Sequence, residues 1–159
     1  LTVGNFNNPR VLSLKGIPLI LKLANELPDF KFRIVGINLE SLIPVNTKPS
    51  NVELIKLKNK TELRGYFSES QYYIQASRLE GLPNALCEAM LCECIPIGNE
   101  VFGIPNAIGD TGLLFNGIKE IEQIKSFLRN NHSKTGIKAR QRIIALFNEE
   151  KRIKEFKKI

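Results

Sequence analysis

Short apolar runs of strand length alternate along this chain with longer segments whose apolar residues recur at helical spacing. Residues 14–27, for example, carry apolar side chains at positions 14, 17, 20, 21, 23, 24 and 27. We expect further helices at residues 61–70, where Thr61 begins a capping box, and at 83–91, 105–108, 118–129, 134–147 and 149–158. We expect strands at residues 1–4, 31–36, 52–57, 71–75, 95–98 and 112–115, and loops at residues 5–14 and 38–50.

This alternation, with connections of a few residues, predicts a parallel sheet covered by helices on both faces. The expected fold class is therefore α/β, a Rossmann-like doubly wound parallel sheet. The 159 residues suffice for one hydrophobic core, and no linker or internal repeat divides them. We expect a single domain over residues 1–159, with ligands bound beyond the carboxyl ends of the strands.

The basic residues are concentrated near the end of the chain, which has a net charge of +7. They form a solvated helix face, or they attract anionic lipid headgroups or phosphorylated ligands. Nucleic acid is not an expected partner, because stacking aromatic residues are not interleaved with the basic ones. No apolar run approaches the ~18 residues that a membrane span needs. Peripheral association with a membrane therefore stays open. The residues concerned are Lys151, Arg152, Lys154, Lys157 and Lys158.

The cysteines and the first residues indicate a cytoplasmic protein. Cys87, Cys92 and Cys94 are odd in number, and residues 1–4 resemble the inside of a strand rather than a secretory signal. We expect reduced thiols that pack as small hydrophobic residues, because His132 lies far along the chain from all three. The absence of an initial Met suggests that the chain derives from a longer one.

Several common phosphate-binding signatures are missing from the sequence. It has neither a G-x-G-x-x-G pattern after the first strand nor a G-x-x-x-x-G-K-[ST] pattern, which argues against dinucleotide oxidoreductases and P-loop NTPases. Asp29 and Asp110 are the only aspartates and do not form an acidic pair that would hold Mg²⁺ or Mn²⁺. Any phosphate bound by this chain must therefore be held without a metal.

Residues 77–90 provide such a site. Residues 77–81 form a turn after the strand at 71–75, and Pro83 suits the first position of a helix. The unpaired N–H groups and positive dipole of a helix start favour phosphate, and Gly81 allows a ligand to approach the backbone closely.

Two glutamates flank this helix start. The carboxylate of Glu80 can accept hydrogen bonds from sugar hydroxyls, and Glu88, two helical turns further on, can accept them from a ribose diol. The alternative is an ordinary strand–turn–helix crossover with two solvent-exposed glutamates, and the spacing alone does not decide between the two.

The stretch from Ser77 to Met90, S-R-L-E-G-L-P-N-A-L-C-E-A-M, resembles the E-x7-E motif of retaining glycosyltransferases with the GT-B fold, family 4 in particular. Val3-Gly4, Lys15-Gly16 and residues 32–36, 94–97, 102–105 and 111–115 match further family segments in the same order. The similarity runs to about residue 116, and it implies that the chain is one half of a GT-B fold.

The resemblance also implies residue roles. Glu80 would bind the hydroxyls of the transferred sugar, and Glu88 would hold the ribose. Lys15 would neutralise the diphosphate leaving group, whose charge grows as the sugar–phosphate bond breaks. Thr111 and Gly112 are further candidates at the rim. The main chain would contact the sugar and diphosphate at Gly81, Leu82, Pro83 and Asn84.

Two positions depart from the family pattern. Asn5 stands where the family commonly has an arginine that contacts the diphosphate, and Arg10, in the expected loop of residues 5–14, is the candidate substitute. Cys94 stands where a glycine is usual.

The function implied is transfer of a hexose, with retention of configuration and without a metal, from a UDP-, GDP- or ADP-sugar to a glycan or lipid-linked acceptor. Such reactions serve polysaccharide or lipopolysaccharide biosynthesis, in the cytoplasm or at the inner face of the membrane. An N-terminal domain, absent here, would supply the acceptor site, so we expect this chain to bind nucleotide weakly and to transfer nothing. The alternatives are a degenerate nucleotide-binding module, which Asn5 favours, and an interaction domain without nucleotide.

Overall fold

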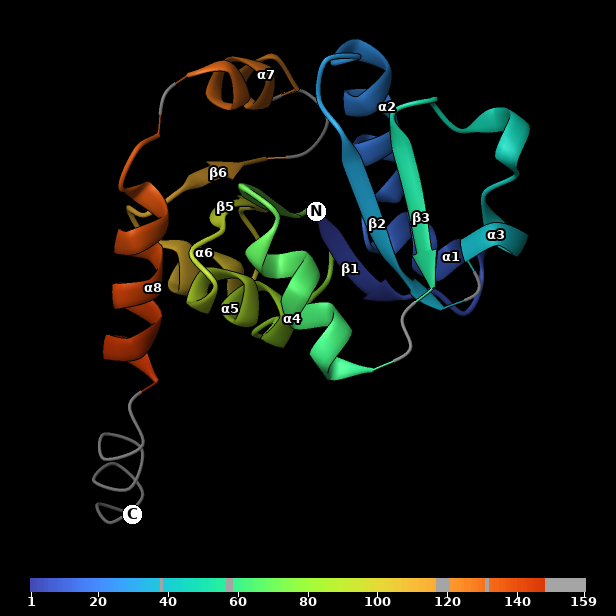
Figure 1. The fold of residues 1–159 in the computed structure, drawn as a ribbon. Helices are drawn as coiled ribbons and strands as arrows, with labels where there is room; N and C mark the ends of the chain where they lie inside the picture. Colours follow the sequence, from blue (N-terminus) through green and yellow to red (C-terminus); the bar gives the residue numbers. More distant parts are fainter. Residues whose placement is uncertain (38, 57–58, 117–120, 131, 148–159) are drawn as a thin grey trace.

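The apolar runs form strands, as the sequence predicts. The structure is a computed structural model, and it describes residues 1–37, 39–56, 59–116, 121–130 and 132–147 (Figure 1). Its strands are β1 (Thr2–Asn5), β2 (Phe32–Ile37), β3 (Val52–Lys56), β4 (Tyr72–Gln75), β5 (Ile95–Asn99) and β6 (Leu113–Phe115). Its α-helices are α1 (Pro9–Leu14), α2 (Ile17–Glu26), α3 (Leu39–Leu42), α4 (Lys60–Ser68), α5 (Asn84–Leu91), α6 (Ile104–Ile108), α7 (Ile121–Arg129) and α8 (Thr135–Leu146).

The strands form two three-stranded parallel sheets, β1-β2-β3 and β4-β5-β6. Strand β1 joins the two, because Leu1 N–H donates to Tyr72 O at 2.9 Å and Ile74 N–H donates to Leu1 O at 2.8 Å. The strand order across both sheets is therefore β3-β2-β1-β4-β5-β6, which confirms the doubly wound α/β fold. The order reverses between β1 and β4, and ligands bind at such switch points, beyond the carboxyl ends of the strands.

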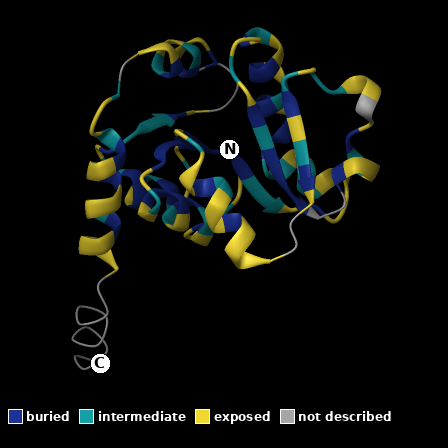
Figure 2. Ribbon diagram, in the orientation of Figure 1, coloured by how far each residue is buried: buried dark blue, intermediate teal, exposed yellow. Residues whose placement is uncertain are grey.

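Helices cover both faces of the sheet, and a separate hydrophobic core lies between the helices and the sheet on each face (Figure 2). Successive residues of β4 point to opposite faces: Tyr72 and Ile74 pack in the core beneath α2 and α7, and Tyr73 packs in the core beneath α4, α5, α6 and α8. All four residues of β4 are buried. Among the residues that the structure describes, every helix is too short or too polar to cross a membrane.

Several expected boundaries are wrong. The expected helix at 14–27 begins only at Ile17, and the loop expected at 5–14 contains α1, so that Lys15 and Gly16 lie between two helices. The loop expected at 38–50 contains α3 and a 3-10 turn, Val45–Thr47. Asn59 rather than Thr61 caps α4, because its side chain accepts a hydrogen bond from Glu62 N–H at 2.9 Å. The helix expected at 149–158 and the basic tail lie outside the described residues.

Gly16 brings the start of α2 against the end of β4. Its φ is 75°, a left-handed conformation that disfavours other residues, and a Cβ added there would lie 2.1 Å from Ala76 O. The neighbouring backbone is bonded as well, with Arg78 N–H donating to Leu14 O at 2.8 Å. These contacts fix the position of Lys15 relative to the turn that follows β4.

We expect Gly16→Ala to lower the free energy of unfolding by at least about 2 kcal/mol, because it adds left-handed strain to a backbone clash. The matched control is Gly65→Ala in α4, where an added Cβ meets nothing within 4 Å. The control should stabilise the chain by about 0.5–1 kcal/mol, since alanine is the better helix former. Urea denaturation measures both, and equal effects would contradict the assigned contact.

Candidate functional site

The turn after β4 and the junction between α1 and α2 meet at the carboxyl edge of the sheet. There Lys15 Nζ forms an ion pair with Glu80 Oε2, although the two residues are 65 positions apart. Their side chains are 28% and 20% exposed, so solvent screens this pair less than an exposed one. The structure thus brings together the two residues to which the resemblance assigns catalysis.

A buried chain of hydrogen bonds leads to Glu80. Tyr73 Oη–H donates to Gln75 Oε1 at 3.1 Å, and Gln75 Nε2 donates to Ser77 Oγ at 2.7 Å. Ser77 Oγ–H in turn donates to Glu80 Oε2 at 3.2 Å. Asn99 Nδ2 holds the Ser77 carbonyl oxygen at 3.1 Å. The side chains of Gln75, Ser77 and Asn99 therefore position Glu80.

The sequence analysis did not identify Gln75, Ser77 or Asn99. All three are buried polar residues, and Gln75 and Asn99 are the last residues of β4 and β5. The sequence signal that could have identified Gln75 and Asn99 is a polar residue at the end of a predicted apolar strand, at the edge of a parallel sheet where ligands bind. It is a weak signal, because polar residues also end strands that lead into ordinary turns.

The start of α5, which follows Glu80 closely in the chain, offers main-chain donors. The helix begins at Asn84 and Pro83 is its N-cap, one position later than expected. The N–H groups of Leu86 and Cys87 bond to Pro83 O at 3.1 and 3.3 Å, whereas the earlier amides of Asn84 and Ala85 have no acceptor within the helix. A Cβ added to Gly81, in the turn before α5, would meet nothing within 4 Å, which leaves room for a ligand.

Glu88 lies on the exposed side of α5, and its carboxylate makes no hydrogen bond or ion pair with a described residue. Burial raises the pKa of the Tyr73 hydroxyl, and the nearby charges of Glu80 and Glu88 raise it further. Both carboxylates therefore raise the pKa of the same buried tyrosine. Among the described residues, no direct hydrogen bond joins one carboxylate to the other.

The two residues considered as diphosphate ligands in the first loop are not part of the Lys15–Glu80 pair. Asn5 is exposed at the end of β1, and Arg10 is exposed in the first turn of α1 rather than in a loop. Neither makes a hydrogen bond or ion pair with Lys15 or Glu80. Thr111 donates to Ile108 O at 2.7 Å, and a Cβ added to Gly112 would lie 2.1 Å from Pro96 O, so both make structural contacts.

The loop after β5 supports the turn from the other side. A Cβ added to Gly103 would lie 2.8 Å from Gly81 O and 3.1 Å from Leu82 Cα. Around this contact three large apolar side chains are exposed: Leu79 is 58% exposed, Leu82 42% and Phe102 65%. The carboxyl edge of the sheet therefore carries exposed apolar side chains as well as the Lys15–Glu80 ion pair.

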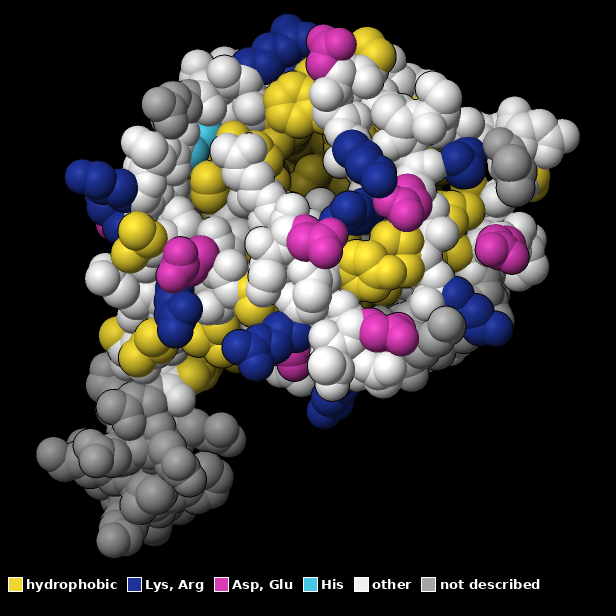
Figure 3. Space-filling model, viewed as in Figure 1, with side chains coloured by type: hydrophobic (Ala, Val, Ile, Leu, Met, Phe, Trp, Pro, Cys, Tyr) yellow, Lys and Arg dark blue, Asp and Glu magenta, His cyan; other side chains and the backbone are white. Residues whose placement is uncertain are grey.

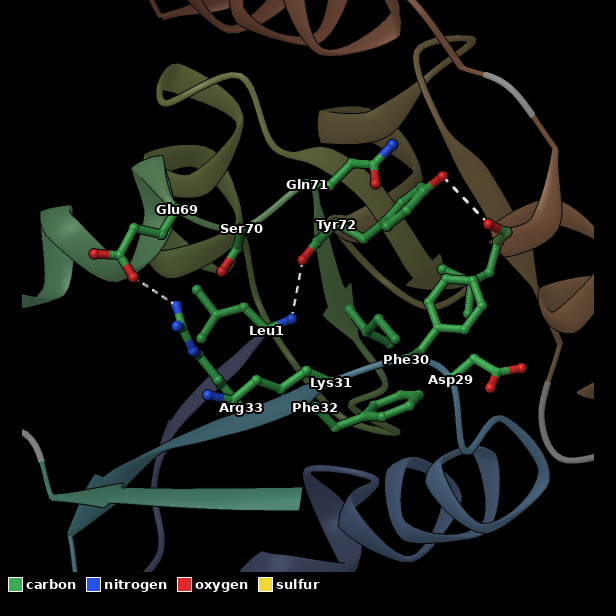
Figure 4. Close-up of a pocket in the computed structure, with 12 residues that line it drawn as sticks. Leu1, Asp29, Phe30, Lys31, Phe32, Arg33, Glu69, Ser70, Gln71 and Tyr72 are labelled. Carbon is green, nitrogen blue, oxygen red and sulfur yellow. Dashed lines mark hydrogen bonds and ion pairs between the residues drawn. The ribbon is translucent and has the colours of Figure 1, made fainter. Parts of the chain in front are cut away.

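Two cavities lie at opposite edges of the sheet. A cleft of about 280 Å³ at the carboxyl edge adjoins the site, and its lining includes Gly16, Ala76, Arg78, Asn99 and Asn116. A cavity of about 290 Å³ lies at the amino ends of β1, β2 and β4 (Figure 4). Figure 3 shows it as a hollow with apolar side chains inside and charged ones at its rim.

The amino-edge cavity is a poorer candidate site. Its Arg33 is already paired with Glu69 at 2.8 Å, and Leu1 N–H donates to Tyr72 O at 2.9 Å. Sheets of this topology bind ligands at the opposite edge.

Metal ligands do not cluster in the part of the chain that the structure describes, where no group of three His, Cys, Asp or Glu residues would hold an ion. Cys94 is buried, and its Sγ lies 3.1 Å from Phe67 O. Burial raises the pKa of its thiol to about 12. Cys94 therefore packs as a small hydrophobic residue, as expected.

We expect Gly103→Ala to displace the turn at Gly81 and Leu82, because the added methyl group meets their backbone. The φ of Gly103 is −82°, which alanine adopts freely, so the effect is steric alone. Amide chemical-shift changes should be concentrated at residues 81–85. A uniform pattern, or one confined to α6, would contradict the contact.

Comparison with known proteins agrees with this fold. The family model "Glycosyl transferases group 1" matches residues 1–130. The structure of TarM superposes with a TM-score of 0.76 and 18% identity over 98% of this chain. A mutant of TarM from S. aureus, solved with Fondaparinux, alpha-GlcNAc-glycerol and UDP, gives 0.76 and 19% over 98%.

The pneumococcal O-GlcNAc transferase GtfA, solved with UDP and GlcNAc, gives a TM-score of 0.70 and 19% identity over 99% of this chain. The chain spans 34% of the length of each of these proteins. A sequence comparison with curated proteins gave no significant match. Because the family model covers most of the chain, including the turn after β4 and the start of α5, the chain belongs to the glycosyl transferases group 1 family.

Proposed function

We propose that this chain is the donor-binding half of a retaining, metal-independent hexosyltransferase. The observation that carries the proposal is the Lys15–Glu80 pair, which lies at the switch point of the sheet beside the amides that begin α5. A cation and free amides suit a diphosphate, and the adjacent carboxylate suits sugar hydroxyls.

Each group has a distinct role in this proposal. Lys15 and the amides of Asn84 and Ala85 bind the diphosphate and stabilise its charge as the sugar–phosphate bond breaks. Glu80 accepts hydrogen bonds from the transferred sugar, close to Gly81 and Leu82. Glu88, whose carboxylate is exposed on α5, accepts hydrogen bonds from the ribose.

Among UDP-, GDP- and ADP-sugars, a UDP-sugar is the first donor to test, because two of the similar structures contain UDP. Base selectivity is proposed to depend on the loop around Lys58 to Lys60, of which residues 57 and 58 lie outside the described residues. The proposed acceptor is a hydroxyl of a glycan or of a lipid-linked saccharide.

Acceptor binding is proposed to need a further domain. The chain spans 34% of the length of similar glycosyltransferase structures, and its apolar side chains Leu79, Leu82 and Phe102 are exposed at the carboxyl edge. Such a patch suits contact with another part of the enzyme. We propose that this chain alone binds donor but does not transfer sugar.

A second function is favoured by one observation. Asn5 is exposed at the end of β1, where the family commonly has an arginine, and Arg10 does not reach the Lys15–Glu80 pair. A site with one diphosphate cation suits a module that binds nucleotide without turnover. Sugar transfer by the complete enzyme would exclude this alternative.

The proposal is tested by ligand-observed NMR titration of the chain with UDP, GDP and ADP. We expect Lys15→Ala to weaken binding of the preferred nucleotide roughly tenfold, since it removes a charge-assisted contact. Lys22→Ala is the matched control, because Lys22 is half exposed on α2 and, among the described residues, forms an ion pair only with Glu26, at 3.9 Å. It should leave binding unchanged.

Glu88→Ala should weaken binding of a nucleoside diphosphate but not of inorganic pyrophosphate, because only the nucleotide carries a ribose. EDTA should change neither affinity. No binding of any nucleotide would support an interaction domain instead, and equal losses in the Lys15 and Lys22 variants would refute the site.

A further inference from the structure

We propose that Glu80 competes with anionic ligands for Lys15, so that the site prefers a sugar-bearing diphosphate to a bare one. The inference rests on the proposed function where it assigns Lys15 to the diphosphate. It adds a discriminating role for Glu80, and it makes Ser77 and Gln75 positioning residues for that role.

The Lys15 ammonium is already neutralised within the protein. Glu80 Oε2 accepts hydrogen bonds from both Lys15 Nζ and Ser77 Oγ. A diphosphate that takes the ammonium leaves this oxygen with the serine hydroxyl alone, beside a second negative group. The Lys15 and Glu80 side chains are mostly buried, so water replaces the lost ammonium contact only in part. For the same reason, it only partly screens the repulsion between Glu80 and the phosphate.

Glu80 is not free to turn away from the incoming anion. In the chain from Tyr73 through Gln75 to Ser77, each group donates toward the carboxylate, with donor–acceptor distances of 3.1, 2.7 and 3.2 Å. Bonds aligned in one direction polarise one another and strengthen the last acceptor interaction. Ser77 is fully buried, and Asn99 fixes its carbonyl oxygen, so the donor to Glu80 stays in place.

A sugar changes this balance. Its hydroxyls donate hydrogen bonds to Glu80 and replace those lost when Lys15 moves to the diphosphate. The second carboxylate oxygen, Oε1, makes no hydrogen bond with a described residue, so it is available to a sugar hydroxyl. A bare nucleoside diphosphate has no sugar beyond its second phosphate to donate such bonds, because its only hydroxyl-bearing ring is the ribose, which the proposed function assigns to Glu88. The donor is therefore bound in preference to the nucleotide that remains after transfer.

The test measures binding of inorganic pyrophosphate, UDP and UDP-GlcNAc to the 159-residue chain by calorimetry. In Glu80→Gln, which keeps the shape and removes the charge, affinity for pyrophosphate and UDP should rise about three- to tenfold. Affinity for UDP-GlcNAc should not rise. The ratio of donor affinity to UDP affinity therefore falls. Unchanged or weaker binding of pyrophosphate would overturn the proposal.

Two controls separate this effect from a general loss of negative charge. Glu100→Gln removes an exposed charge just after β5, and it should change pyrophosphate affinity less than about twofold. In a Lys15→Ala background, Glu80→Gln should give a smaller gain, because no ammonium is left to release and only the repulsion between the carboxylate and the phosphate is relieved. A gain as large as the one measured with Lys15 present would overturn the proposal.

Ser77→Ala tests the positioning role. Loss of the last donor should loosen Glu80 and raise pyrophosphate affinity about twofold, whereas a purely structural role would lower stability without any gain. Ser70→Ala is the matched control, since Ser70 Oγ donates to Tyr66 O at 2.7 Å near the amino end of β4. It should lower stability without changing affinity. If the Ser77 variant does not fold, the Glu80→Gln measurements decide alone.

Failure of this inference differs from failure of the proposed function. If the unmodified chain binds UDP and loses it with Lys15→Ala, but Glu80→Gln gives no gain, only the competition is refuted. If neither the unmodified chain nor Glu80→Gln binds UDP or pyrophosphate, both proposals fail. Binding that becomes measurable only in Glu80→Gln would support the competition strongly.

Discussion

The packing of Gly16 against Ala76 is the constraint on which the site depends. It joins the start of α2 to the end of β4, on either side of the point where the strand order reverses. No side chain fits between the two segments, and their backbones are bonded directly through Arg78 and Leu14. Lys15 is thereby held within reach of Glu80, although neither residue belongs to a helix or strand.

In the proposed function, this geometry lets a chain with few aspartates hold a diphosphate. The positive charge comes from one lysine and from the amides that begin α5, within a site whose polar groups are fixed by buried partners. We propose that Glu80 has two roles in turn. It neutralises Lys15 when no anion is bound, and it accepts hydrogen bonds from sugar hydroxyls when a donor takes the lysine. Fixed polar groups of this kind stabilise developing charge without reorganising during the reaction.

The sequence predicted the strands well because each contains a short apolar run bounded by turn residues. Helix boundaries were predicted less well: α1 is too short to show an apolar period, and Asn59 and Thr61 are both good capping residues. The family resemblance singled out Lys15 and Glu80 separately, but the ion pair between them was not predicted, since 65 positions separate the two in the chain. Gln75, Ser77 and Asn99 were missed, because a polar residue at a strand end shows its burial and its partners only in three dimensions.

A crystal structure of the chain with UDP-GlcNAc is the most direct test of the proposed site. We expect the diphosphate at Lys15 and the amides of Asn84 and Ala85, with the sugar hydroxyls on Glu80 and the ribose on Glu88. Lys15 Nζ should have left Glu80 Oε2 for a phosphate oxygen, while Ser77 still donates to Glu80. A nucleotide bound in the amino-edge cavity beside Arg33 and Tyr72, or one bound with the Lys15–Glu80 pair intact, would contradict it.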